Sequence, residues 1–503
     1  MPFEPVFETI TFCKRKGAAT DRIKVECRTE APAESVAKIL NVSACVSVSG
    51  ATAAAGKLGY GGTITFFVCY EDAEGAVRKC ECGAEFTGNI ENENVTETTR
   101  ARTCGKVVKT EASLAGVKLS VTAAVEITAE LFECASLSAL KGGSDLITET
   151  REVSFAKSYG QRETVYPLED EYELNYRADE VLEHRAEAAV TSVQCGVGSI
   201  IVDGEAYISA IFLQSGEKKD IIRENRTVPF RIEIECEDAM PAFSATARVQ
   251  VRSLKTDVNV DEERGVSQVV CAVSLKASGE AFSEESAEIT EDAFSLKEEL
   301  ELSRAEEESV FECEIRSATV RAGGRASIEE IPARAYVLAA CGENAEIAES
   351  GYSDGVIKGA GVLSMTGLYC DADGKTFSRK AEVPFETSLE IRLEENEEYD
   401  ISVSATRAVM RDVSLIEADI EAELVFTVYP RKRRKIMCIN AAKATGEKAE
   451  TDAAISVYIP TKGEELWSLA KRLNVAPDNL VATNKELEFP LSGEERIVVY
   501  RQK

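Results

Sequence analysis

Histidine and tryptophan are nearly absent from this chain: among 503 residues there is one of each, His184 and Trp467. Catalytic arrangements of the Ser-His-Asp and Cys-His types need a histidine base, which only His184 could supply. This residue lies in the polar stretch Glu183-His184-Arg185 and is expected to face solvent. No glycine-rich phosphate-binding fingerprint opens a predicted helix. The sequence therefore predicts no catalytic residue, no cofactor and no enzyme activity.

Long apolar runs are also missing, so the sequence predicts no transmembrane helix, which needs about eighteen such residues or more. The first residues, Met1-Pro2-Phe3-Glu4-Pro5, lack the basic and apolar regions of a signal peptide. Acidic residues outnumber basic ones, 88 against 58, and a formal net charge of -30 repels nucleic acid and anionic lipid. We therefore expect a cytoplasmic protein without nucleic-acid binding or direct membrane insertion.

The 15 cysteines do not indicate a disulfide scaffold, because their number is odd, the chain is long and no export signal is apparent. Most replace an apolar residue in a strand pattern, where free cysteine acts as a small buried hydrophobe. The closest pair, Cys80-Glu81-Cys82, lacks the further ligands that zinc requires. The acidic runs 306–308 and 394–398 lack the alternating ligand loop of a calcium site and are interpreted as solvated loops. No metal site is predicted.

One basic run, Arg431-Lys432-Arg433-Arg434-Lys435, is present in this acidic chain. We interpret it as the solvated end of a domain, opening a linker over residues 436–454 that is rich in Ala, Lys and Glu. The alternative is an electrostatic contact with acidic residues of the preceding domains or of a partner. As a nucleic-acid patch it would be isolated.

Strand patterns recur along the first 435 residues at a spacing of roughly 150 positions, which is typical of a repeated domain. Each copy has a strand, a glycine-containing turn and a second strand that carries a phenylalanine: Phe86, Phe230 or Phe385. A longer strand with period-two alternation follows each of them. One buried face and one solvated face predict antiparallel sheets. We expect a mainly β fold, with three repeated antiparallel β-sandwich or barrel-like domains.

The recurring unit resembles the SPOCS domain of bacterial spore-coat and spore-envelope proteins. The resemblance rests on the glycine-strand, turn and Pro-Phe pattern, complete at Pro229-Phe230 and Pro384-Phe385, with Glu85 in place of proline in the first copy. It also rests on segment 33–40 and on Asp292-Ala293-Phe294-Ser295, which is similar to a tail motif of the family. The domains that follow from it are residues 1–145, 146–287 and 288–435, then the linker and a module at 455–503.

The C-terminal segment has the pattern of a small α+β module with the order strand, helix, helix, strand (βααβ). Leu466, Leu469, Ala470 and Leu473 share one face of a predicted helix. Thr461 precedes this helix as a candidate cap, and Pro477 suits the first turn of a second helix.

This segment resembles a LysM module, a carbohydrate- or partner-binding domain whose pattern also has a tryptophan where Trp467 stands. In the family, the ligand groove lies between the first strand–helix loop and the second helix–strand loop. Carried over to this sequence, the groove comprises Lys462, Gly463, Glu464, Glu465, Leu466, Asn484, Leu487 and Phe489. Core packing is an equal alternative for Leu466 and Trp467.

Several SPOCS-like units followed by a LysM module form an architecture that implies a non-enzymatic structural adaptor of spore-envelope (coat) assembly. The implied partner of the LysM module is a spore-coat morphogenetic protein of the ATPase type. The alternative is a peptidoglycan-binding protein that recognises N-acetylglucosamine glycan. We favour the protein partner because no signal peptide is apparent and because Gly463-Glu464-Glu465 replaces the usual Gly-Asp-Thr of the family.

Overall fold

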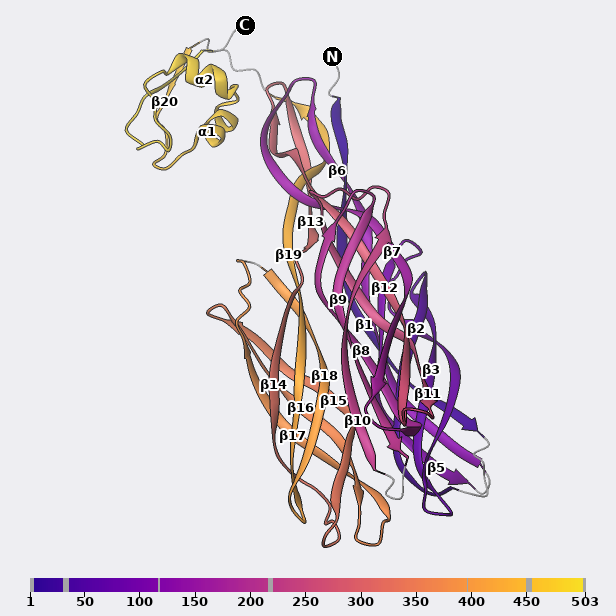
Figure 1. Ribbon diagram of the computed structural model, residues 1–503. Coiled ribbons are helices and arrows are strands. Elements are labelled where there is room, and N and C mark those ends of the chain that lie inside the picture. The colour runs from indigo at the N-terminus through magenta and orange to yellow at the C-terminus, as the bar shows by residue number, and fades with distance from the viewer. Residues whose placement is uncertain are drawn as a thin grey trace.

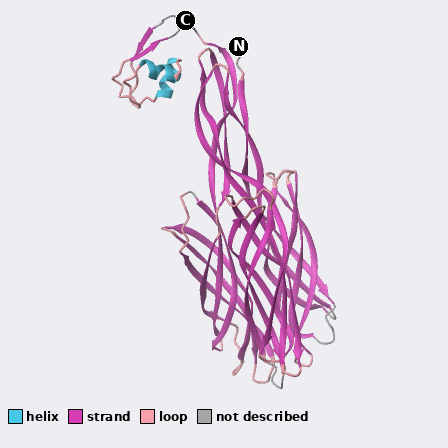
Figure 2. Ribbon diagram, turned by 45° about the horizontal axis from the view of Figure 1, so that its top comes forward, coloured by secondary structure: helices cyan, strands magenta, loops and turns pink. Residues whose placement is uncertain are grey.

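The protein is mainly β. The computed structural model describes residues 4–29, 36–115, 118–215, 220–395, 397–448 and 455–500. Seven antiparallel sheets hold the strands, and the two helices of the described residues lie near the C-terminus (Figure 2). The predicted β-rich character and antiparallel pairing are confirmed. No helix in the described part of the chain is long and apolar enough to cross a membrane.

The first six strands form two sheets, in which β6 lies between β1 and β5, and β3 lies between β2 and β4. Their bounds are β1 (Pro5–Thr29), β2 (Val36–Ala54), β3 (Lys57–Asp72), β4 (Val77–Glu91), β5 (Arg100–Ala115) and β6 (Lys118–Gly143).

The next six strands pair in the same order, with β12 between β7 and β11, and β9 between β8 and β10. Their bounds are β7 (Leu146–Leu174), β8 (Ala178–Cys195), β9 (Ser199–Gln214), β10 (Ile221–Glu235), β11 (Ser244–Asp261) and β12 (Val266–Ser295).

The last set differs in that two strands, β13 and β14, occupy the place of β1 and β7. Here β19 pairs with β13, β14 and β18, and β16 lies between β15 and β17. The bounds are β13 (Glu298–Glu312), β14 (Arg316–Ser327), β15 (Tyr336–Ser353), β16 (Val356–Cys370), β17 (Thr376–Leu389), β18 (Glu397–Ser414) and β19 (Glu417–Glu447).

Each anchor phenylalanine lies across from a glycine of the neighbouring strand. Phe86 pairs with Gly62, Phe230 with Gly204 and Phe385 with Gly361. A Cβ atom at any of the three glycines would overlap the phenylalanine ring. The ring therefore packs directly over the glycine backbone, which explains why glycine occupies a strand interior where it would otherwise weaken the sheet.

The long central strands β6, β12 and β19 continue beyond the body of the molecule as three two-stranded ribbons with β1, β7 and β13 (Figure 1). We call these ribbons the stalk: residues 5–15 with 132–143, 146–158 with 282–295, and 298–312 with 431–447. Its core draws on all three ribbons and includes Ile10, Phe12, Leu137, Phe155, Ile289 and Ile436. The start of β1 and the helical module lie at the free end of the stalk.

The three sets of strands also share a core in the body. Within each set, a large apolar cluster fills the space between the two sheets. A further cluster joins the sheets that contain β3, β9 and β16, through residues such as Cys69, Leu182, Leu213 and Cys341. Burial of apolar surface between the sets therefore connects them into one body.

Two expectations about the divisions of the chain are wrong. The linker expected over 436–454 is strand as far as Glu447, paired with β13, and its residues 449–454 lie outside the described part. The boundary expected between 287 and 288 lies inside β12. Both errors have one cause: β12 and β19 continue into the stalk, where charged residues interrupt the apolar alternation that marks a strand.

The basic run at 431–435 lies within β19 and is not the solvated end of a domain. Its neighbour in the stalk is β13, which contains the acidic run 306–308 that we expected to be a solvated loop. Arg433 lies 3.1 Å from Glu308, and Lys435 lies 2.8 Å from Glu306. The alternative interpretation of the basic run, a contact with acidic residues of the chain itself, is confirmed.

Candidate functional site

The C-terminal module consists of β20 (Ile455–Tyr458), α1 (Leu466–Leu473), α2 (Pro477–Thr483) and β21 (Ile497–Tyr500). β20 and β21 pair antiparallel. Leu469, Ala470 and Leu473 are buried along one face of α1, and Pro477 begins α2, as the sequence predicts. The order of the elements is strand, helix, helix, strand.

The first loop of the predicted groove is hydrogen-bonded to the second. Gly463 has the left-handed φ of 82°, which glycine adopts at no steric cost. Its N–H donates to the carbonyl of Leu491 at 2.7 Å, and the N–H of Leu491 donates to the carbonyl of Glu464 at 3.0 Å. The structure therefore brings the loop 462–465 against the chain that follows Phe489.

Glu464 is used inside this loop. Its carboxylate accepts two hydrogen bonds from Arg472, both at 2.9 Å, and two more from the backbone and hydroxyl of Thr461. The bonds from Arg472 lower the pKa of this carboxyl. Thr461 therefore does not cap α1, which begins only at Leu466 after Glu465. Glu464 closes the loop, so its carboxylate is already paired in the absence of a ligand.

Asn484 is likewise bound within the module. Its amide donates to the carbonyls of Leu480 and Val498 at 2.9 and 2.8 Å and accepts from the N–H of Val498 at 2.8 Å. The two bonds with Val498 connect the end of α2 to β21. A side chain held in this way orients the fold and has little freedom to bind a glycan hydroxyl.

The apolar residues of the predicted groove are half-buried. Leu466, Leu487 and Phe489 pack against the module core, as does Trp467. Core packing is therefore the observed role of Leu466, and Trp467 packs against the same core while its indole N–H bonds outside the module. Lys462 and Glu465 are exposed. A ligand at this surface would meet these two charges and the outer edges of Leu487 and Phe489.

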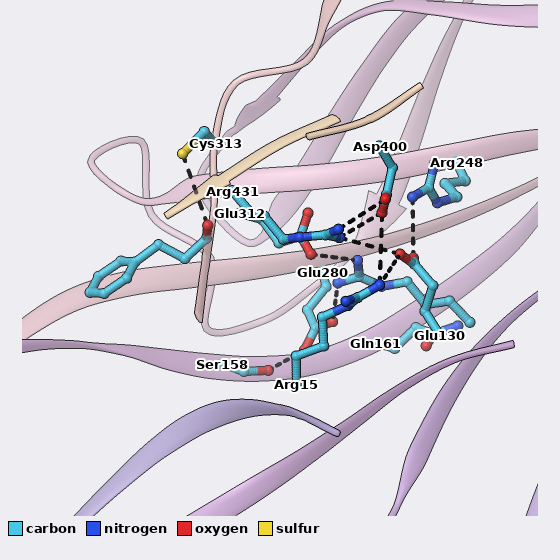
Figure 3. A network of polar contacts seen from close by, with 12 residues as sticks. Arg15, Glu130, Ser158, Gln161, Arg248, Glu280, Glu312, Cys313, Asp400 and Arg431 are labelled. Carbon is cyan, nitrogen blue, oxygen red and sulfur yellow. Dashed lines mark hydrogen bonds and ion pairs between the residues drawn. The ribbon is translucent and has the colours of Figure 1, made fainter. Parts of the chain in front are cut away.

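A second concentration of polar groups is buried at the base of the stalk (Figure 3). Arg102 of β5 lies 2.6 Å from Glu280 of β12 and 3.1 Å from Glu312 of β13. Only 8% of the Arg102 side chain and 2% of the Glu280 side chain are exposed. The three strands belong to the three different sets, so this contact fixes how the sets meet.

The same network continues through Arg431 and Asp400, whose side chains approach to 2.6 Å. Burial alone would raise the pKa of Asp400, but hydrogen bonds from Arg431 hold it at about 2. Burial likewise acts to raise the pKa of Glu280, and the charges of Arg102 and Arg100 lower it below its ordinary value. Carboxylates held ionised by arginines are unsuited to proton transfer near neutral pH, so the network is structural.

His184 is buried in β8, which corrects the expectation that it faces solvent. Its ring meets the Phe67 ring edge-on, with centroids 4.7 Å apart. Neither ring nitrogen has a hydrogen-bond partner among the described residues. Burial lowers the pKa of His184 to about 4, with a smaller contribution from the charge of Lys79. A histidine without an orienting partner or access to substrate is not placed to act as a general base.

The sequence reasoning missed the charged network and Asp292, which contacts the module. Glu130 also belongs to the network, because one of its carboxylate oxygens lies 3.5 Å from Arg431. A signal for the network was present: Glu130 and Glu280 stand about one repeat period apart, and Arg100 and Arg102 occupy alternate positions of one strand. The ion pairs between the sets could not be read from it, because Arg102 contacts Glu280, and Arg431 contacts Glu130, across different sets of strands.

Metal-ligand geometry is absent from the described residues, which contain no group of three or more His, Cys, Asp or Glu placed to hold an ion. In comparisons with protein families, curated proteins and solved structures, no family model, no curated protein and no solved structure matches this chain.

Proposed function

We propose that this chain is a non-enzymatic structural adaptor of spore-envelope (coat) assembly, built from three copies of one SPOCS-like β unit and a LysM module that binds a protein partner. The strand order that recurs in the three sets supports the three-copy interpretation. The three glycine–phenylalanine pairs support it further, because each occupies the same place in its sheet.

Irregularities of the strands recur as well. β2, β8 and β15 each contain three register shifts, and the middle one lies at Ile39/Asn41, Val181/Glu183 and Cys341/Asn344 respectively. Register shifts of this kind bend a strand and redirect its side chains. The shifts place polar groups at the junction of the sets, where Asn41 donates to Glu183 at 2.8 Å. In β2 and β8 the three shifts are spaced identically along the strand, which independent strands would have no reason to share.

The connected body favours a scaffold over a flexible string of domains. The stalk core, the shared body core and the network around Arg102 each draw on all three sets of strands. Large apolar contacts of this kind hold units in one relative orientation. An adaptor with a fixed body presents its binding module at one end, in a defined direction.

The choice of a protein partner rests on how the polar side chains of the module groove are hydrogen-bonded. Glu464 and Asn484, the polar groups of the groove best suited to bind glycan hydroxyls, are bound within the module itself. Lys462 and Glu465 are exposed beside apolar Leu487 and Phe489. Mixed charge around an apolar centre suits a protein interface. We propose a coat morphogenetic protein of the ATPase type as the partner, with peptidoglycan as the alternative.

Charge reversal at the two exposed groove positions tests this function. We expect full-length Lys462→Glu and Glu465→Lys to capture less of the partner from a lysate of sporulating cells than the unaltered chain. Lys57→Glu, a reversal on the exposed surface of the body, is the matched control and should capture normally. Equal capture by all four proteins would show that the groove is not part of the interface with the partner.

A further inference from the structure

The outer face of α1 carries polar donors that the module does not use itself. The indole N–H of Trp467 donates to the carboxylate of Asp292 at 2.8 Å. Lys471, one turn further along α1, donates to the same carboxylate at 2.8 and 2.6 Å. Asp292 belongs to β12, at the end of the stalk, and is 175 positions away from Trp467.

An aromatic ring and a backbone group complete the contact. The rings of Phe294 and Trp467 meet edge-on, with centroids 5.2 Å apart, and Phe294 belongs to the same apolar cluster as the module core. Asn474, which follows the last residue of α1, donates to the carbonyl of Leu296 at 2.8 Å and accepts from Lys448 at 2.8 Å. Carboxylate, ring and carbonyl therefore follow one another along a single segment, Asp292–Leu296.

The contact has the composition of a peptide-recognition site. An ammonium and an indole N–H on one carboxylate are charge-assisted bonds, which are stronger than neutral ones. The adjoining ring gives apolar area and edge-to-face geometry. Glu464 and Asn484, two of the polar residues of the groove, are by contrast directed into the module's own fold.

We propose that the outer face of α1 is a recognition site for a protein segment with a carboxylate followed two residues later by an aromatic ring, and that the chain's own Asp292–Leu296 occupies it. The chain thereby holds its module against the stalk. The proposal assigns a second surface to the module and does not depend on what the groove binds.

Because the chain's own segment occupies the site, a competing segment binds there only above a certain concentration. A tethered ligand acts at an effective concentration on the order of 1 mM when the tether is short. A free peptide of the same chemistry must exceed that level to enter the site of the unaltered chain. Once the internal contact is weakened, the same peptide should bind at much lower concentration.

Trp467 reports on this site without labelling, because it is the only tryptophan of the chain. In full-length Asp292→Ala we expect its emission to move to longer wavelength and its quenching by acrylamide to increase, because the indole loses a partner and gains water. Lys471→Glu alters the module and leaves the stalk unchanged, and it should shift the Trp467 emission in the same way. Glu291→Gln removes the adjacent carboxylate, whose partner is Arg151, and should leave the emission unchanged.

Addition of a peptide then tests recognition. The probe is the octapeptide Ile-Thr-Glu-Asp-Ala-Phe-Ser-Leu, residues 289–296, with an Asp→Ala version as control. We expect the probe to return the emission of Asp292→Ala toward that of the unaltered chain, and the control peptide to have no effect. Unchanged emission in both Asp292→Ala and Lys471→Glu, or equal binding of the two peptides, would overturn the proposal. The capture experiments with the Lys462 and Glu465 variants test the proposed function independently of this site.

Discussion

Arg102 and Glu280 form a buried ion pair across 178 positions of sequence, with Nη2 of the arginine 2.6 Å from Oε2 of the glutamate. One residue comes from β5 and the other from β12, so the pair joins the first set of strands to the second. Buried pairs of this kind often contribute less to stability than apolar packing would, and their best-attested use is to specify one arrangement of parts. We interpret the pair as a determinant of how the strand sets fit together.

Removal of one partner should be costly. In Arg102→Met, the carboxylate of Glu280 loses its closest counter-charge while it remains buried, and we expect a loss of about 3–5 kcal/mol in the free energy of unfolding. Chemical denaturation followed by circular dichroism measures this. Arg22→Met is the matched control, because the pair of Arg22 with Glu126 is largely exposed and should matter little. If the two variants unfold alike, the buried pair has no special role.

Stability should fall in acid, and the sign follows from the lowered pKa values. Asp400, at about 2, and Glu280 both have folded-state pKa values below those of an unfolded chain, near 4. The unfolded state therefore binds protons first, and the stabilisation present above about pH 4 is lost as the pH falls toward 2. Thermal unfolding recorded from pH 6 to pH 2.5 measures the slope. In Asp400→Asn the slope should be smaller, and an unchanged slope would contradict the assignment.

His184 contributes an acid sensitivity at higher pH. Its folded-state pKa of about 4 lies below the ordinary value near 6.5, so the unfolded state takes up the proton first. Stability from this residue is present above about pH 6.5 and is lost as the pH falls toward 4. We expect His184→Leu to remove that part of the pH dependence.

At neutral pH, His184→Leu should leave the protein equally stable or more stable, since it replaces a buried ring whose nitrogens have no partner. The same pH series of thermal unfolding decides this. A large loss of stability at pH 7 would show that the ring nitrogens are bonded after all.

The thiols should remain reduced and react slowly in the native protein. Eight of the 15 cysteines are buried, and two, Cys104 and Cys134, are exposed. Burial raises the pKa of Cys45 to about 11 and that of Cys13 to about 12, so neither forms the reactive thiolate at neutral pH. Thiol counting with and without denaturant should find very few fast sites in the native chain, because desolvation raises the pKa of the Cys104 thiol as well. Rapid labelling of most thiols would contradict the burial.

The sequence predicted the β fold and the elements of the module because both depend on local periodicity. The alternation in β6, β12 and β19 and the apolar face of α1 can be read residue by residue. The stalk could not be predicted in this way, because residues 431–447 are stabilised by pairing with β13, more than a hundred positions away. The same limit explains why His184 was expected to face solvent. Its neighbours in sequence are charged, whereas it is buried against Phe67 of another sheet.

At the candidate site, the family resemblance implied that the loops around 462–466 and 484–489 line one groove, but not what each side chain does there. Glu464 and Asn484 have the chemistry of ligand-binding residues, and only their partners Arg472 and Val498 show that they are engaged in the fold. Trp467 was assigned to the core or the groove, whereas its indole N–H binds Asp292. In both cases the decisive contact joins segments that no local pattern connects.

Co-sedimentation of the full-length protein with purified peptidoglycan, in parallel with affinity capture from a lysate of sporulating cells, tests the adaptor function most directly. At micromolar concentration, we expect the protein to stay in the supernatant when the peptidoglycan is sedimented. In the affinity capture, we expect it to bind a coat morphogenetic protein, and we expect Lys462→Glu to bind less of it. Strong sedimentation with the wall and no captured protein would contradict the adaptor function and establish the glycan-binding alternative.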